Sequence, residues 1–373
     1  MDLHLSEEQQ QIVESAETFL AKASSMAQVR ALTQAKTPMD SALWSAMAEL
    51  GWPGVNLPEE VGGLNLDGVS LCLLQEQLGR RLACVPFFDT VVLAAEALKA
   101  LQAQALAHHW LEKIAQDKVI ASLSLDPSQA TATVSDSGWH LTGTWRSVGS
   151  AQLADILLLP AQMPSGETCL FALPQPAELL RITPQINLDA TRCSAQVQAH
   201  NIALSSELCL ARGSAAKDLL ARVKCWGAIG LAAEQVGVAQ QCLDMALAYV
   251  LERQQFGRPI ASFQAIKHRC AQMLVEVESA RSAVYGAACT ADAHPELPSL
   301  KVSAALARVT ATQAAQFCAR ENLQLHGGVG FTWEYDPHFY LRRAQASSQC
   351  LGPVSEWLEG VASQLETSEL GQA

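Results

Sequence analysis

The feature that most constrains the fold is a change of pattern along the chain, from helical spacing to short apolar runs and back. Up to about residue 117 apolar residues recur every three or four positions, and Ser6 with Gln9 forms a capping box before the first stretch. Residues 118–212 carry short apolar runs between Gly, Ser, Pro and Asp, which is typical of a small sheet domain. Helical spacing then returns. The sequence predicts an N-terminal helical domain (1–117), a middle β-domain (118–212) and a C-terminal helical domain (213–373).

The composition indicates a globular chain whose partner is not a nucleic acid. The 373 residues are 49% hydrophobic and 17% charged, which is ample for a packed core. The net charge is −12 and the isoelectric point is about 5.2. A nucleic-acid binder normally presents a basic face, so that class is disfavoured, whereas an anionic nucleotide can still be held by a few local arginines.

The 11 cysteines are odd in number, and no two form a CxxC pair. We interpret them as small buried residues in a reducing compartment and predict neither a disulfide framework nor a metal site. The start, Met1-Asp2-Leu3-His4, lacks a basic and apolar leader, and no apolar run reaches the roughly 20 residues of a membrane span. The expected location is cytoplasmic, without membrane contact.

Segment 253–264 (RQQFGRPIASFQ) follows an amphipathic helical stretch and is broken by Gly257 and Pro259. Arg253 then lies near a helix end, beside Phe256. The planar fork of an arginine suits a pyrophosphate, because it makes two parallel charge-assisted bonds. The alternative is a helix C-terminus whose arginine meets the negative end of the helix dipole.

Segment 324–334 (QLHGGVGFTWE) ends another helix at a double glycine, where a ligand can approach the backbone closely. The amide of Gln324 offers both a donor and an acceptor. Alone, this segment is an ordinary helix stop. His326 is then a packed or turn histidine, and Asp336-Pro337-His338 a turn.

These two segments, extended to RQQFGRPIASFQAIKHRCAQM and QLHGGVGFTWEYDPHFYLRRA, resemble the signatures of the acyl-CoA dehydrogenase family of flavoenzymes. LGWPGVNLPEEVGG at 50–63 and Glu76-Gln-Leu-Gly79 resemble its N-terminal domain. The resemblance spans nearly the whole chain. It implies an α+β fold, with an N-terminal helical domain, a middle β-barrel or sandwich and a C-terminal four-helix bundle. It also implies an oligomer, usually a tetramer.

The cofactor implied by the resemblance is FAD, held mainly by a neighbouring subunit. Seven residues of this chain would face that flavin: Arg253, Gln255, Phe256, Gln264, Gln324, Gly327 and Gly328. The implied reaction is α,β-dehydrogenation of an acyl-CoA thioester, in which a carboxylate removes the α-proton and the flavin accepts a hydride. An electron-transfer acceptor would reoxidise the flavin.

The expected base is missing. Most members of the family carry a glutamate at the position that corresponds to Leu351, and a minority carry it on the helix position that corresponds to Leu220. Neither leucine can accept a proton. Asp218 is a weak candidate, about half a turn from Leu220, and Glu234 and Asp244 are interpreted as ordinary helix carboxylates.

Two flavin-contacting segments of the family are also altered. A Thr-Glu-Pro-Gly loop is represented by residues 125–128, Leu-Asp-Pro-Ser. A Trp-x-Thr segment is represented by residues 147–149, Ser-Val-Gly, and Trp145 stands two positions early.

The chain therefore resembles the subunit without a base in heteromeric acyl-CoA dehydrogenases of steroid side-chain and alicyclic degradation. In that interpretation a paralogous subunit supplies the base and the flavin bed in a heterotetramer, and the substrate is a bulky CoA thioester. Two alternatives stay open: a non-catalytic structural or regulatory subunit, and a homo-oligomeric enzyme with an unusual base, such as Asp218 or an acid near Asp336.

Overall fold

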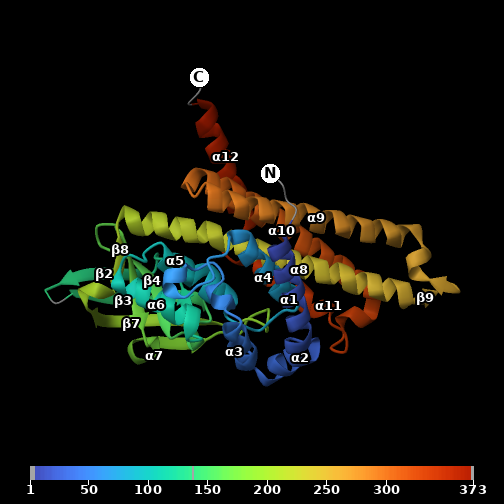
Figure 1. Ribbon diagram of the computed structural model, residues 1–373, viewed down its shortest axis with the longest axis horizontal. Coiled ribbons are helices and arrows are strands. Elements are labelled where there is room, and N and C mark those ends of the chain that lie inside the picture. The colour runs from blue at the N-terminus through green and yellow to red at the C-terminus, as the bar shows by residue number, and fades with distance from the viewer. Residues whose placement is uncertain (1–4, 137, 371–373) are drawn as a thin grey trace. The chain divides into compact units, whose positions relative to one another are not determined.

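The structure is a computed structural model that describes residues 5–136 and 138–370 (Figure 1). Its elements follow the predicted order of helices, sheet and helices. The first helices are α1 (Glu7–Ala23), α2 (Met26–Ala35), α3 (Ser41–Glu49), α4 (Gly68–Arg80), α5 (Glu96–Lys99) and α6 (Ala105–Gln116). A π-helical stretch, Phe88–Ala95, precedes α5.

The middle of the chain contains β1 (Ala121–Leu123), β2 (Ala130–Ser135), β3 (Gly138–Gly149), β4 (Ile156–Gln162), β5 (Thr168–Pro174), the short α7 (Pro176–Leu179), β6 (Arg181–Pro184), β7 (Ser194–Leu204) and β8 (Cys209–Arg212). The last part contains α8 (Ser214–Glu252), the hairpin strands β9 (Gln254–Gln255) and β10 (Arg258–Pro259), α9 (Gln264–Ala293), α10 (Leu297–His326), α11 (Pro337–Gln349) and α12 (Val354–Leu370).

A local signal places the first helix start where the sequence predicts it. The capping box at Ser6 is present, since its side chain accepts from Gln9 N while the Gln9 side chain accepts from Ser6 N, both at 3.1 Å. The segment 336–338, expected as a turn, instead begins α11. Pro337 occupies the first turn of that helix, where a missing N–H removes no helical hydrogen bond.

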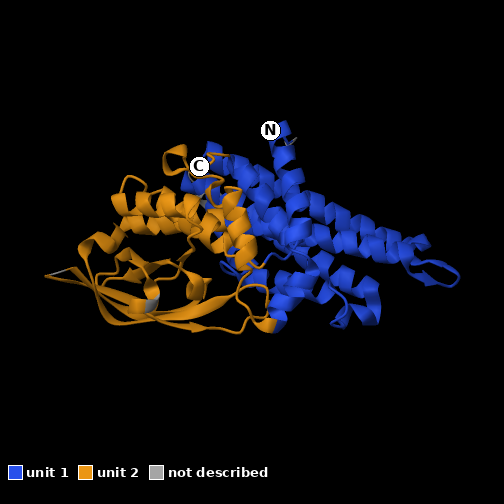
Figure 2. Ribbon diagram, turned by 60° about the horizontal axis from the view of Figure 1, so that its bottom comes forward, with its two compact units in different colours: residues 1–34, 67–83, 228–373 blue, residues 35–66, 84–227 orange. Residues whose placement is uncertain are grey.

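The chain forms two compact units that are interleaved along the sequence (Figure 2). Unit 1 contains the described residues up to Gln34, then Asp67–Ala83 and the chain from Ala228 onward. Unit 2 contains Ala35–Leu66 and Cys84–Gly227. The three-domain division at residues 117 and 212 stays a prediction.

Unit 2 is built on an eight-stranded sheet within the described residues, in the order β6-β7-β3-β2-β4-β5-β8, with β1 also paired to β4 in parallel. Side chains of β4 alternate between two apolar clusters, because successive residues of a strand point to opposite faces. Leu157 and Leu159 join one cluster with Trp145 and Phe171. Ile156 and Leu158 join another, to which α6 and the first turns of α8 contribute.

Unit 1 is a helical bundle in which α4 and α8 touch through their backbones. Each helix carries the pattern Glu-Gln-x-Gly, at Glu76–Gly79 and at Glu234–Gly237. A Cβ on Gly79 would lie 2.2 Å from Glu234 O, and one on Gly237 would lie 1.9 Å from Glu76 O. The two patterns therefore fit each other reciprocally, and only glycine permits so close a crossing.

Both glutamates at this crossing are buried and paired. Arg343 donates to Glu234 at 2.9 Å, and Arg281 donates to Glu76 at 3.0 Å. Tyr285 also donates to Glu76, at 2.8 Å, and burial raises the pKa of its hydroxyl. These bonds satisfy charges that would otherwise be costly to bury. They also tie α8 to α11 and α4 to α9, so the C-terminal helices form the predicted bundle.

No helix in the described part of the chain is long and apolar enough to cross a membrane.

Candidate functional site

The segment after α8 folds into a small hairpin. Helix α8 ends at Glu252, and β9 pairs with β10 so that Gln255 lies opposite Arg258. Between them Phe256 and Gly257 both have positive φ, 53° and 74°, as the tight turn of a two-residue hairpin requires. Phe256 projects from the tip, with 91% of its surface exposed. Figure 1 shows this hairpin at the far end of α8 and α9.

The hairpin is locally basic. Arg253, Arg258, Lys267 and Arg269 lie within residues 253–269, which contain no Asp or Glu. The guanidinium of Arg258 lies 4.2 Å from the ring centre of Phe263, which holds it in place. In a chain with a net charge of −12, this cluster is a local attraction for an anion.

The main chain is accessible at the end of α10. After His326 the chain turns through Gly327, at φ 64° and ψ −144°, into a 3-10 turn. A Cβ on Gly327 or Gly328 would meet no atom within 4 Å. These two glycines therefore leave room for an outside group, unlike Gly79 and Gly237. Gln324, one turn earlier, is exposed.

Aromatic contacts bring the two segments together. Tyr249 lies one turn before Arg253, and its ring stacks on that of His326 at 4.2 Å. The Nδ1 of His326 is 2.8 Å from Asn322 O, and burial lowers the pKa of its imidazole. His326 is thus a packed histidine, as expected. The sequence analysis missed Tyr249, although its position four residues before Arg253 places it on the same helix face.

All seven residues that the resemblance assigns to the flavin are exposed at this end of the bundle: Arg253, Gln255, Phe256, Gln264, Gln324, Gly327 and Gly328. Large apolar side chains close to them in sequence are also exposed: Leu247, Leu251, Phe331, Trp333 and Tyr335. Trp333 is held by contacts with Arg342 and His338. Clustered exposed apolar side chains of this kind are typical of a binding or subunit interface.

Position 351 lies in a turn between α11 and α12. Leu351 is half-buried and has a φ of 62°, followed by Gly352 at 93°. Its carbonyl accepts a hydrogen bond from Trp357 Nε1 at 3.2 Å. Leu220, the other position considered for a base, is buried in an apolar cluster. Asp218 is exposed on the first turns of α8.

The other candidate carboxylates are held in ion pairs. Glu234 pairs with Arg343, Asp244 lies 2.8 Å from Arg80, and Asp336 bonds Arg30. These contacts give all three carboxylates structural partners.

The altered segments of the β-domain are also ordered by local bonds. Asp126 accepts from Ser128 N at 2.8 Å, which closes the turn at 125–128. Trp145 is buried and donates from Nε1 to Pro160 O at 2.9 Å. Its ring belongs to the sheet core, so this tryptophan is not free to pack on a ligand.

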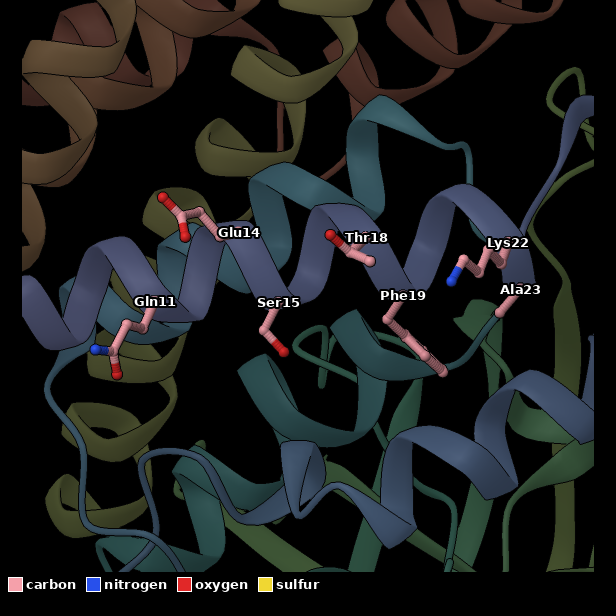
Figure 3. A pocket seen from close by; sticks show the side chains of 7 residues that line it. All are labelled: Gln11, Glu14, Ser15, Thr18, Phe19, Lys22 and Ala23. Carbon is pink, nitrogen blue, oxygen red and sulfur yellow. The ribbon is translucent and has the colours of Figure 1, made fainter.

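Two further features carry no site. The hollow in Figure 3 is open and is lined by side chains of α1 alone, between Gln11 and Ala23. None of the residues singled out in the sequence lines it. Within residues 5–136 and 138–370 no group of three His, Cys, Asp or Glu side chains could hold a metal ion.

Two family profiles match most of the chain. The profile described as "Acyl-CoA dehydrogenase, N-terminal domain" matches residues 6–118, and "Acyl-CoA dehydrogenase, C-terminal domain" matches residues 225–355. The chain is similar to acyl-CoA dehydrogenase IpdE2 of Mycobacterium tuberculosis, with 32% identity over 96% of this chain and 98% of that protein.

Two solved structures are similar along almost their full length. One is the ChsE4–ChsE5 complex of Mycobacterium tuberculosis, with a TM-score of 0.90 and 25% identity over 98% of this chain and 99% of that chain. The other is a variant of the steroid ACAD Tcur3481–Tcur3483, with a TM-score of 0.87 and 27% identity over the same shares.

Proposed function

This chain belongs to the acyl-CoA dehydrogenase family of FAD-dependent oxidoreductases, and we propose that it is one of two unlike subunits of a heteromeric member. In this proposal its arginine hairpin contacts a flavin shared with a related chain, and that related chain supplies the proton acceptor. The observation that carries the proposal is Leu351 at the position where the family has its base.

The first argument for two unlike subunits is the missing base. Dehydrogenation needs a carboxylate at the α-carbon of the thioester, and FAD, when bound, accepts the hydride from the β-carbon. In this chain position 351 presents a leucine, and position 220 is filled by a core leucine. Glu234 and Asp244 are engaged by arginines. In this proposal the carboxylate of a complete site comes from another chain.

The residues at the bundle end fit a dinucleotide. Arg253 is exposed in a basic hairpin and would bind the pyrophosphate through its planar fork. Gly327 and Gly328 leave open space in which a ligand can reach the backbone. The amides of Gln255, Gln264 and Gln324 would complete the contacts.

The opposite half of a flavin site is not matched. The turn at 125–128 lacks the family's Thr-Glu-Pro-Gly, and Trp145 is committed to the sheet core. Because only the hairpin end is matched, we expect the partner to hold most of the flavin and this chain to contribute the remaining contacts. Relatives support the heteromeric assembly, since one solved structure is of a ChsE4–ChsE5 complex and another is of a steroid ACAD with two named chains.

The proposed substrate is a CoA thioester with a bulky acyl group, and a separate electron-transfer protein takes the electrons. A cytoplasmic location is part of the same proposal.

The test compares flavin retention in two arginine variants. The chain is purified alone and together with the product of the adjacent gene, and bound FAD is measured by its absorbance after gel filtration. Arg253→Ala should reduce the FAD of the complex at least tenfold. Arg212→Ala, which removes another exposed arginine, bonded to Glu167 in the β-domain, should leave it unchanged.

Two results would decide against the proposal. A lone chain that is fully flavinated and oxidises acyl-CoA indicates a homo-oligomeric enzyme, and loss of that activity in Asp218→Asn would identify its base. If the chain alters only assembly and Arg253→Ala releases no FAD, it is a structural subunit.

A further inference from the structure

Arg308 in α10 is one of the largest fully buried side chains of the protein, with 0% of its surface exposed. Its Nη2 donates to Ser347 O at 2.8 Å, Ser348 O at 3.1 Å and Cys350 O at 2.9 Å. These carbonyls lie at the end of α11 and just after it, where a helix leaves its last oxygen atoms without helical partners. A single guanidinium therefore caps this helix end.

The charge of Arg308 is balanced by dipoles. The C-terminal end of a helix carries a partial negative charge, which favours a cation there. The other nitrogen, Nη1, donates to Gln235 Oε1 at 3.0 Å and contacts Thr312 Oγ1. Gln235 is itself fully buried in α8. Arg308 thus fixes the end of α11 against both α8 and α10.

The backbone that follows is unusual for its sequence. Leu351 has a φ of 62°, a left-handed conformation that leucine rarely adopts. The adjoining bonds are from Cys350 N to Ser347 O, at 3.2 Å, and from Trp357 Nε1 to Leu351 O. In each of these bonds the atom that belongs to the turn is a main-chain atom. The surroundings, and not the leucine side chain, impose its conformation.

We propose that Arg308 is a positioning residue for the turn at residues 350–353, so that the turn presents position 351 in one direction whichever side chain stands there. Only the identification of position 351 with the family's base rests on the proposed function. With that identification, Arg308 supports a turn that in this chain carries a leucine at the base position. Leu351→Glu would then place a carboxyl at the base position without rebuilding the backbone.

The test is hydrogen exchange measured by mass spectrometry on the full chain. The reporter is a peptide that spans residues 345–358, and a peptide across β4 and β5 is the reference. Arg308→Met should speed exchange in the reporter at least tenfold and leave the reference unchanged. Arg308→Lys keeps the charge but reaches fewer carbonyls, so its exchange should lie between that of the wild type and that of Arg308→Met.

The companion variant is Leu351→Glu, whose reporter peptide should exchange within about twofold of the wild-type rate after correction for the new residue. Its backbone strain is no greater, because glutamate and leucine meet the same left-handed restriction. If Leu351→Glu loosens the turn as much as the arginine variants do, the side chain holds the turn and the proposal is wrong.

Two other outcomes also count against it. Equal exchange rates of the reporter peptide in the wild type, Arg308→Lys and Arg308→Met would show that the guanidinium does not hold the turn. Equal acceleration of the reporter and of peptides throughout the bundle in Arg308→Lys would show a general packing role. Because neither FAD, substrate nor partner is required, failure of the heteromer proposal leaves this result unaffected.

Discussion

Two regions of unit 1, the crossing of α8 with α4 and the hairpin that follows α8, differ in the space around their glycines. At the crossing with α4, Gly237 lies where a Cβ would meet Glu76 O at 1.9 Å, and the neighbouring charges are buried in ion pairs. At the hairpin end, a Cβ on Gly257 would meet nothing within 4 Å, and Phe256 stands exposed. The crossing is complete within one chain. Under the proposed function, a second molecule completes the hairpin end.

The largest effect is expected at the crossing. Gly237→Ala should destabilise the protein by about 5 kcal/mol or more, because the new methyl group must displace the backbone of α4. Gly286→Ala in α9 is the matched control, since nothing lies within 4 Å of its Cβ and alanine favours a helix by roughly 0.5–1 kcal/mol. Urea unfolding of both variants checks this, and equal stabilities would remove the contrast.

A smaller loss is expected from the buried ion pair. Arg343→Met leaves Glu234 buried without this cation and should cost about 3–5 kcal/mol. The control is Arg269→Met, which removes an arginine of a more exposed pair with Glu321 and should cost under about 1 kcal/mol. Thermal unfolding of the two variants would contradict this reasoning if Arg269→Met were the less stable.

At the bundle end, backbone strain alone should matter. Gly327→Ala has open space but a φ of 64° and ψ of −144°, a region that glycine alone adopts readily, so we expect a cost of about 1–3 kcal/mol. Gly328→Ala, where no positive φ is required, should cost less. Chemical unfolding separates the two, and a larger loss in Gly328→Ala would show that packing matters there.

The exposed phenylalanine sharpens the comparison further. Phe256→Ala should change the free energy of unfolding by no more than about 0.5 kcal/mol, since the side chain is already exposed. Under the proposed function it should nevertheless weaken FAD binding in the complex. Leu358→Ala, at another exposed apolar position, should leave both quantities unchanged. A stability loss in Phe256→Ala without flavin loss would argue against a binding role.

The smallest effect concerns pH. Burial, with Arg342 and Arg30 nearby, lowers the pKa of His338 below its usual 6.5, against an opposite effect of Asp336. As the pH falls, His338 is protonated in the unfolded chain before it is protonated in the folded protein. Its contribution to the free energy of unfolding is therefore complete above pH 6.5 and is lost as the pH falls below that value. His338→Phe should flatten the fall in melting temperature between pH 7.5 and 5.5. An unchanged pH profile would contradict this assignment.

Features that depend on neighbouring residues were predictable. The capping box at Ser6 and the helix break before Gly257 follow from local chemistry, and both are present. The close fit of Gly79 with Glu234 was not predictable, because it depends on how two helices 155 residues apart approach each other. For the same reason Glu234 was expected to be an ordinary helix carboxylate, and its buried pairing with Arg343 became visible only in the fold.

The sequence alone determined that position 351 is a leucine, which cannot accept a proton in any conformation. It also determined the family, because the two signatures are continuous stretches of chain. The tertiary structure decided that Tyr249 and His326 unite those signatures at one exposed end, and that Arg308 fixes the turn around Leu351. These arrangements depend on contacts between helices far apart in sequence, which local pattern does not specify.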